Sequence, residues 1–576
     1  MSHSSIAPTH NNTANTQKSI FKRRILSRQL WITDGSAIGL IIVLYTIQEL
    51  FSYNGIGKVI ALILKEKNWP ENDINLFNFS KYIIGVKILL GPIIDTFYNK
   101  SFGRRKSWII PTAMATGVIT IFLSYNFEDY LVKFSSWELS GVYSLGLIFN
   151  SACNVAINGF VLSVITRENI GLVGIAMTFG INLGRLLANG LATILRDPNF
   201  CNKYIRPYLG LTNKDYPFVT FSIILNYFGV VYVLGSAIFM FYSEKKVEPQ
   251  HYRSKNGIGE KINFLKNLKI ILNILKRPVI FMYIILVASF SMGSFIVENA
   301  FEQKLVNLGY SESKIWNIEF VGYGVKLILP WLFHSKINCT VPLRLFNKCW
   351  FSLILLSFFS MVLIYCTRVI GGINQESDFY GQENLMNNLP DYWVYGIASF
   401  LILKIAILVT AWTCIMSFLS KISDPMVGAT SLTVLIMIYN IRHLLLSPLY
   451  MKGIEYFTSY ACFYDSQIGD NNEDDSKLNL NMTDCAIQKG HYSIKTDGYY
   501  IFGSICCISS MLMYISLRHR IHQIDNYTRK NWFYKGSIHV DDHSSETWFY
   551  YDTSSEDEIF KSREKSGTLN SKVVWA

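Results

Sequence analysis

The feature that most constrains this chain is a series of apolar blocks of about 20 residues, separated by short polar segments. A block of that length allows an α-helix to cross the hydrocarbon core of a bilayer. Half of the residues are hydrophobic (50%) and only 16% are charged, whereas a soluble domain needs more charged side chains to cover its surface. The pattern predicts an all-α polytopic membrane protein and argues against a soluble enzyme.

The blocks predict about twelve membrane-spanning helices. The expected spans are 36–64, 76–97, 107–126, 138–164, 170–194, 218–242, 278–300, 315–334, 345–369, 392–419, 426–450 and 498–517. A long basic segment separates six spans from six and indicates a linker between two halves. The chain then consists of the tail 1–35, the first half 36–242, the linker 243–277, the second half 278–517 with its long loop 451–497, and the tail 518–576.

The basic residues indicate the orientation of the helices, since Lys and Arg gather in cytoplasmic segments of membrane proteins. The N-terminal tail ends in a basic cluster within 22–28, and the linker 243–277 is basic too. Both segments are cytosolic if the N-terminus is, and the C-terminal tail then lies on the same side. This placement accounts for the net charge of +12 without a nucleic-acid partner, for which no motif is present.

Two internal repeats support the division into halves. The segment 85–90 (Gly-Val-Lys-Ile-Leu-Leu) resembles 324–329 (Gly-Val-Lys-Leu-Ile-Leu), and the junction 165–171 resembles 422–428. The matches occur in the same order and at equivalent places in the two halves. Two parallel six-helix halves around a central cavity are the arrangement of the major facilitator fold, which is the fold class that we expect.

Four expected spans carry a cation in their interior, where a charge is costly and therefore a candidate for function. Lys87 and Lys326 occupy equivalent places in the first repeat, and Arg185 and Arg442 follow the glycines of the second repeat at equal distances. His443 adjoins Arg442. These helices border the cavity in the major facilitator fold, so we expect the five side chains to bind an anion, with arginine suited to phosphate. The alternative is that both arginines extend to the membrane surface.

Two acidic residues, Glu49 in the first span and Glu298 in the seventh, also lie in repeat-equivalent helices. Two interpretations stay open for them. A buried glutamate can carry a proton, or each glutamate is the charge partner of a nearby lysine. Both are therefore candidate coupling residues.

The short loop between the second and third spans begins at Asp95 and carries Arg104, Arg105 and Lys106. An acid at a helix end and a basic cluster can form charge pairs that latch one conformational state. The alternative is a basic loop that only sets the orientation of the helices in the membrane.

The loop 451–497 faces the non-cytosolic side in this orientation. It contains Cys462, Cys485 and the sequon at Asn481. Two cysteines on an oxidising face can pair, so we predict a Cys462–Cys485 disulfide, with Cys201 as a competing partner. The spacing of the other cysteines gives no metal-binding signature.

Several motifs are specific enough to indicate a family. They are Gly-Pro-Ile-Ile-Asp at 91–95, Phe-Gly-Arg-Arg-Lys-Ser-Trp at 102–108, Thr-Arg-Glu-Asn-Ile-Gly at 166–171, Phe-Cys-Asn-Lys-Tyr-Ile-Arg at 200–206, Lys-Ile-Ser-Asp-Pro at 421–425 and Asp-Gly-Tyr-Tyr at 497–500. Together they resemble the acetyl-coenzyme A transporter family of the endoplasmic reticulum membrane, and the sequence looks like a fungal member.

The resemblance implies a secondary transporter that moves acetyl-CoA from the cytosol into the endoplasmic reticulum lumen in exchange for free CoA. Both ligands are phosphate-rich anions, in agreement with the interior cations, and Lys87 falls on a lysine of the family pattern. The resemblance implies a lipid bilayer as the surroundings, no cofactor and no metal, and it leaves a homodimer open. An enzyme is not expected, because no catalytic triad, metal cluster or glycine-rich phosphate loop is present.

The chain departs from the family pattern at five positions along the expected path. Asn154 and Asn158 replace aspartates, so neither can hold a charge or accept a proton. Arg442 and His443 replace two small residues, and Arg185 replaces an uncharged one. These changes leave open a changed substrate such as another organic anion or a peptide-sugar, a changed coupling ion, or a receptor on a transporter fold that binds without transport.

Overall fold

The structure is a computed structural model of the whole chain. It describes residues 34–99, 101–133, 135–166, 169–242, 272–273, 275–310, 312–333, 342–371, 389–423, 428–463 and 491–526. In these residues nearly every element is a helix, and the only sheet is an antiparallel hairpin of two strands.

The elements fall into two halves in chain order. The label η marks a short 3-10 or π-helical segment. The first half holds the helix Asp34–Leu50, η1 (Tyr53–Gly57), α2 (Lys58–Glu66), α3 (Glu71–Phe79), η2 (Ser80–Val86), α4 (Lys87–Thr96), α5 (Lys106–Lys133), α6 (Ser136–Val164), α7 (Leu172–Arg185), η4 (Leu186–Leu191), α8 (Ala192–Arg196), α9 (Pro198–Phe200), η5 (Cys201–Ile205) and α10 (Phe221–Met240). The second half holds α12 (Pro278–Phe295), η6 (Ile296–Ala300), α13 (Phe301–Asn307), α14 (Glu312–Leu332), α16 (Pro342–Ile370), α18 (Asp391–Ile422), α19 (Gly428–Ile441), η8 (Arg442–Leu446), α20 (Ser447–Tyr456), β1 (Ser459–Phe463), β2 (His491–Thr496) and α22 (Gly498–Asn526).

Ten of the described helical segments are long and apolar enough to cross a membrane, and the bent pair Asp34–Leu50 and Tyr53–Glu66, with 44° between its parts, adds one span. The bend falls near Gly55, whose backbone leaves helical geometry (φ −87°, ψ −119°). The remaining expected span is α14, which is less apolar because it carries Glu319 and Lys326. The prediction of an all-α polytopic membrane protein with about twelve spanning helices is confirmed.

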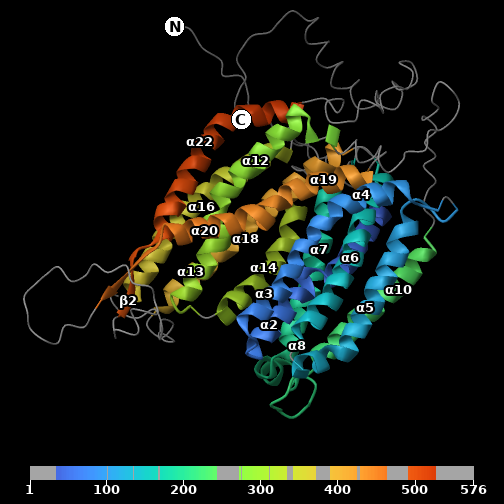
Figure 1. Cartoon of the computed structure of the whole chain (residues 1–576), viewed down its shortest axis with the longest axis horizontal. Helices are drawn as coiled ribbons and strands as arrows, with labels where there is room; N and C mark the ends of the chain where they lie inside the picture. Colours follow the sequence, from blue (N-terminus) through green and yellow to red (C-terminus); the bar gives the residue numbers. More distant parts are fainter. Residues whose placement is uncertain are drawn as a thin grey trace, which may run out of the picture.

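The helices of the two halves lie side by side, with the first half drawn in blue to green and the second in yellow-green to red (Figure 1). Within the first half α5 packs against α10 and α6, and within the second half α16 packs against α18 and α22. Between the halves, α19 packs against α4 and α6, and α7 packs against α18 and α14. A site shared by both halves is therefore built on these helices.

The bundle has two ends. The latch end is where α4 ends and α19 begins, and the hairpin end is the opposite end, with α8 and the β1–β2 hairpin (Figure 1). In the hairpin, Cys462 is the backbone partner of Tyr492. Cys485 and Asn481 lie outside the described residues, so the disulfide and glycosylation predictions remain predictions. The competing partner, Cys201, is a buried free thiol.

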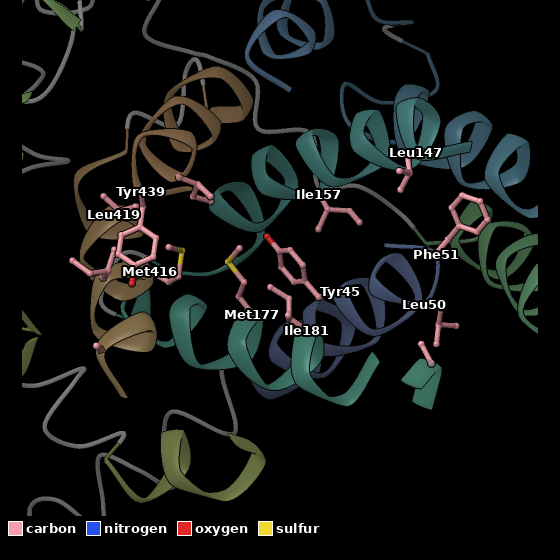
Figure 2. Packing of buried hydrophobic residues seen from close by; sticks show 14 of the residues in the cluster. Tyr45, Leu50, Phe51, Leu147, Ile157, Met177, Ile181, Met416, Leu419 and Tyr439 are labelled. Atoms are coloured by element: carbon pink, nitrogen blue, oxygen red, sulfur yellow. The ribbon is translucent and has the colours of Figure 1, made fainter. Parts of the chain in front are cut away.

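Apolar side chains of both halves pack between the helices (Figure 2). Tyr45, Ile157 and Met177 come from the first half, and Met416 and Tyr439 come from the second, and all five are at most 4% exposed. Between helices in a bilayer, such close packing supplies the attraction, because lipid is as apolar as the side chains themselves.

Four π-helical segments lie beside the four charged residues Glu49, Arg185, Glu298 and Arg442. Glu49 lies one turn before η1, Arg185 immediately precedes η4, Glu298 lies inside η6, and Arg442 opens η8. A π segment rotates the side chains after it and occurs often at functional sites. The two halves thus place their interior charges at equivalent irregularities.

Candidate functional site

Glu49 and Arg185 form an ion pair within the first half. Arg185 ends α7, and its Nε donates to Glu49 Oε1 at 2.7 Å. The helices approach closely because a glycine precedes the arginine: a Cβ on Gly184 would lie 2.6 Å from the carbonyl oxygen of Thr46 and 2.8 Å from Glu49 Cβ. The side chain of Glu49 is 8% exposed, and that of Arg185 is 32% exposed. The arginine is therefore partly accessible despite its partner.

Glu298 and Arg442 form the corresponding pair in the second half. Arg442 Nη2 donates to Glu298 Oε1 at 2.8 Å. The guanidinium lies over the rings of Tyr439 and Phe290, at 4.6 and 5.1 Å from their centroids, and the side chain is 6% exposed. His443 Nε2 lies 3.6 Å from the same glutamate oxygen. This arginine is enclosed by its partners.

Both arginines form ion pairs inside the helix bundle, whereas the alternative interpretation of the sequence placed them at the membrane surface. The helical span continues from Arg185 to Arg196, and from Arg442 to Tyr456, which is roughly three turns or more in each case. The partner of each glutamate is an arginine and not the lysine that the sequence interpretation considered.

Lys87 opens α4 and contacts the first asparagine that departs from the family pattern. Its Nζ donates to Asn154 Oδ1 at 3.0 Å, and the Asn154 amide donates to Gln48 Oε1 at 2.9 Å. Lys87 also lies within electrostatic range of Glu49 and Arg185. Its direct partner is thus neutral, and its positive charge is compensated only at longer range.

The second asparagine, Asn158, joins the two halves without any charge. Tyr45 donates its hydroxyl hydrogen to Asn158 Oδ1 at 2.7 Å. The Asn158 amide in turn donates to Thr433 Oγ1 in α19 at 3.2 Å. The asparagine is 1% exposed, so it belongs to the closed contact between the halves.

Lys326 lies in the middle of α14, with its Nζ 4.5 Å from the centroid of the Tyr323 ring. The Tyr323 hydroxyl accepts a hydrogen bond from Asn189 Nδ2 at 3.3 Å, which joins α14 to η4 of the first half. Lys326 lies within electrostatic range of Glu319, Arg185 and two further lysines. The repeat-equivalent lysines 87 and 326 therefore have different partners.

Sequence reasoning missed four charged residues of this region, which are Lys58, Glu302, Glu319 and Lys404. Lys404 is 5% exposed and forms an ion pair with Glu302. It stands alone among the apolar residues of α18, and this isolated charge was the available signal. Lys58 and Glu302 lie at the starts of helices beside π segments, where charged residues are ordinary, and Glu319 follows several polar residues in the first half of α14.

Asp95 connects the loop after α4 to the start of α19 at the latch end. Its Oδ1 accepts hydrogen bonds from Arg105 at 2.6 Å and Arg104 at 3.2 Å. Its Oδ2 accepts from the backbone N–H of Thr430 at 2.9 Å and from its hydroxyl at 2.6 Å. Arg105 passes close to Gly159, where a Cβ would lie 2.6 Å from the guanidinium carbon. One carboxylate thus holds the two halves together at this end.

The fourth member of the expected loop cluster, Lys106, has a different role from Arg104 and Arg105. Its Nζ donates to the carbonyl oxygens of Met240 and Tyr242, both at 2.7 Å. These carbonyls lie at the end of α10, so Lys106 fastens the loop to the first half.

The site as a whole has more cations than carboxylates. The cations are Lys58, Lys87, Arg185, Lys326, Lys404 and Arg442. The carboxylates are Glu49, Glu298, Glu302 and Glu319. They come from both halves and can attract a polyanion to the interface. In the part of the chain that the structure describes, no group of His, Cys, Asp and Glu side chains could hold a metal ion.

Comparison with known proteins gives matches over most of the chain. The profile of a family described as "Acetyl-coenzyme A transporter 1" (Acatn) matches residues 37–277 and 382–534. An uncharacterised protein of Schizosaccharomyces pombe is 21% identical over 453 residues, which cover 78% of this chain and 80% of that protein. An uncharacterised membrane protein of Saccharomyces cerevisiae is 20% identical over 554 residues, which cover 86% of this chain and 96% of that protein.

Among solved structures, the major facilitator proton:xylose symporter XylE superposes with a TM-score of 0.45 and 14% identity, covering 84% of this chain and 96% of that chain. The described helices form an all-α bundle in which α4, α6 and α7 of the first half pack against α14, α18 and α19 of the second. Because the family profile matches well over half of the residues, the chain belongs to the acetyl-coenzyme A transporter family, and it is a membrane transporter and not an enzyme.

Proposed function

We propose that this protein is a secondary carrier of acetyl-CoA, or of a related CoA-like or nucleotide-like anion, and that it works by alternating access in exchange for free CoA. The observation that carries the proposal is the excess of cations at the interface of the two halves. Arg185 and Lys326 approach from opposite halves and lie within electrostatic range of one another. A phosphate group can accept hydrogen bonds from both at once.

The latch end is closed by uncharged and charged contacts between the halves. Asn158 bonds to Thr433, and Asp95 bonds to Thr430. Alternating access requires that such contacts break when the opposite end closes. The four residues are therefore proposed gate residues. We further propose that the latch end faces the cytosol, together with both termini, and that the membrane is the endoplasmic reticulum membrane, as the family resemblance and the basic segments favour.

The test is the uptake of labelled acetyl-CoA by liposomes that contain the purified protein, with and without CoA trapped inside. We expect uptake that trapped CoA stimulates and that Lys87→Ala reduces strongly, because Asn154 and Gln48 cannot replace the lost charge. A matched control is Lys65→Ala, which removes a lysine from the exposed face of α2.

Two results would redirect the proposal. Uptake of other organic anions or of peptide-sugars, but not of acetyl-CoA, would keep the carrier and change its substrate. Ligand binding without any uptake by folded protein would favour a receptor on a transporter fold, the alternative that Asn154 and Asn158 leave open.

A further inference from the structure

Glu319 in α14 differs from the other carboxylates of the site. Glu49, Glu298 and Glu302 each contact a cation directly. Among the described residues Glu319 has no hydrogen-bond or ion-pair partner, although its side chain is partly buried. It lies within electrostatic range of four cations, which are Lys58, Lys326, Lys404 and Arg185. Glu319 therefore lies among cations but forms an ion pair with none of them.

The cations around Glu319 come from both halves. Lys58 begins α2 with an exposed side chain, and Arg185 ends α7 with 32% of its side chain exposed. Lys326 approaches from α14 and is partly exposed over the Tyr323 ring. The packing of α7 and η4 against α14, and of η1, which precedes α2, against α7 and η4, keeps these elements together. Three accessible cations thus face one region from two sides of the interface.

We propose that Lys58, Arg185 and Lys326 form a subsite for a phosphate or pyrophosphate group, and that Glu319 is its built-in counter-anion. The carboxylate lowers the repulsion among the cations when no ligand is bound. The inference rests on the proposed function, because it names the place where the phosphates of a polyanionic substrate bind and the residue against which they compete.

A tethered counter-anion lowers the net positive charge that a ligand meets, so only a ligand with several charges binds appreciably. A ligand with one negative charge gains little, because Glu319 already supplies one such charge to the same cations. A pyrophosphate brings more charge and enough oxygens to bond several cations at once. Glu319 therefore weakens the binding of every anion and raises the number of charges that a ligand needs in order to bind here.

The test compares the full-length protein and Glu319→Gln in lipid nanodiscs, by titration with inorganic pyrophosphate and with acetate at low salt. We expect the variant to bind pyrophosphate roughly tenfold more tightly, because one repulsive charge is gone. Acetate should also bind more tightly, but by a smaller factor, because it carries only one charge. Glu66→Gln is the matched control, since it removes a carboxylate whose partner is Arg196 outside the cluster, and should leave both affinities unchanged. Unchanged or weaker pyrophosphate binding by folded E319Q would overturn the proposal.

A second readout needs no substrate. Without added anion at low salt, E319Q should unfold at a lower temperature than the wild type, because the cations then repel one another without compensation. Pyrophosphate, or the second substitution Lys326→Gln, should restore the unfolding temperature. A single variant that fails to fold while the double variant folds leads to the same conclusion. Failure of both to fold would overturn the proposal, since charge balance is then not what Glu319 supplies.

The two readouts separate this inference from the proposed function. Suppose that the wild type exchanges no CoA, but that E319Q has a lower unfolding temperature at low salt and pyrophosphate restores it. The proposed substrate is then wrong, and the role of Glu319 as a counter-anion is supported. If the wild type exchanges CoA and E319Q equals it in affinity and unfolding temperature, the function stands and the counter-anion is wrong.

Discussion

The two interior ion pairs join the same residue types at repeat-equivalent places, yet they differ in their surroundings. Arg185 bonds Glu49 through Nε and is 32% exposed. Arg442 bonds Glu298 through Nη2, lies over two aromatic rings and is 6% exposed. The difference shows that the arginine of the second half is enclosed by its partners, while that of the first half stays partly accessible.

The residue just before each arginine also differs between the two pairs. Gly184 allows the Arg185 backbone to lie close to the first helix, since a Cβ there would meet the Thr46 carbonyl oxygen and Glu49. The corresponding residue in the second half is Ile441, whose side chain is 36% exposed. There the enclosing contacts come instead from Phe290 and Tyr439.

The largest loss of stability is expected from Arg442→Ala. The substitution leaves Glu298 as an enclosed charge, with His443 and the Ser294 hydroxyl as its remaining close contacts, which costs about 3–5 kcal/mol in the free energy of unfolding. Denaturant unfolding of the purified protein measures it. Removing both charges in Arg442→Ala with Glu298→Ala should cost less than the single change. A loss no greater than that of Arg185→Ala would break the comparison between the pairs.

Arg185→Ala should cost less stability and more function. Lys87 lies within electrostatic range of Glu49 and compensates part of its charge, so we expect a loss of about 1–3 kcal/mol. The rate of anion exchange should fall by roughly tenfold or more, because a guanidinium that can donate two hydrogen bonds to one phosphate group is lost. Arg185→Lys keeps the charge but lacks the planar guanidinium, so its exchange rate should lie between those of the wild type and Arg185→Ala. Transport rates per amount of folded protein measure both variants.

Gly184→Ala tests the close approach in the first half. The added Cβ would meet the carbonyl oxygen of Thr46 and the side chain of Glu49, so we expect a loss of about 1–3 kcal/mol. Ile441→Ala, at the corresponding place in the second half, should change stability by only about 0.5 kcal/mol, because that side chain is partly exposed. Equal thermal unfolding shifts for the two variants would contradict this explanation.

The smallest effect is expected at the ion pair of Arg196 with Glu66, whose glutamate side chain is 50% exposed. Glu66→Gln should cost less than about 1 kcal/mol, as exposed pairs generally do, and should leave anion exchange unchanged. The same unfolding and transport measurements check it. A large loss of stability or of exchange in Glu66→Gln would mean that removing any charge has such effects, whether or not the charge lies in the interior.

Much of the fold was predictable from the sequence because the bilayer imposes long apolar helices. The interior cations Lys87, Arg185, Lys326 and Arg442 were also predictable, since each interrupts an apolar run. Their partners were not. Whether a glutamate meets an arginine or a lysine depends on how neighbouring helices are rotated, and local sequence patterns do not contain this information.

Other parts of the site had a weaker signal or none. Lys404 could have been found from its apolar neighbours. It lacks a counterpart in the first half, so a comparison of the two repeats does not identify it. Glu319 follows four polar or charged positions in α14, so this part of the sequence resembles an ordinary polar helix start. Only the packing of α14 against α7 brings it among cations of both halves.

The central claim is that a polyanionic coenzyme crosses the membrane along the interface that Arg185 faces. The most direct measurement is the initial rate of labelled acetyl-CoA uptake into liposomes loaded with CoA, for the wild type and Arg185→Gln in parallel, at equal amounts of folded protein. We predict uptake that depends on trapped CoA in the wild type and is largely lost in R185Q. Equal uptake by R185Q, or none by folded wild type, would contradict the account.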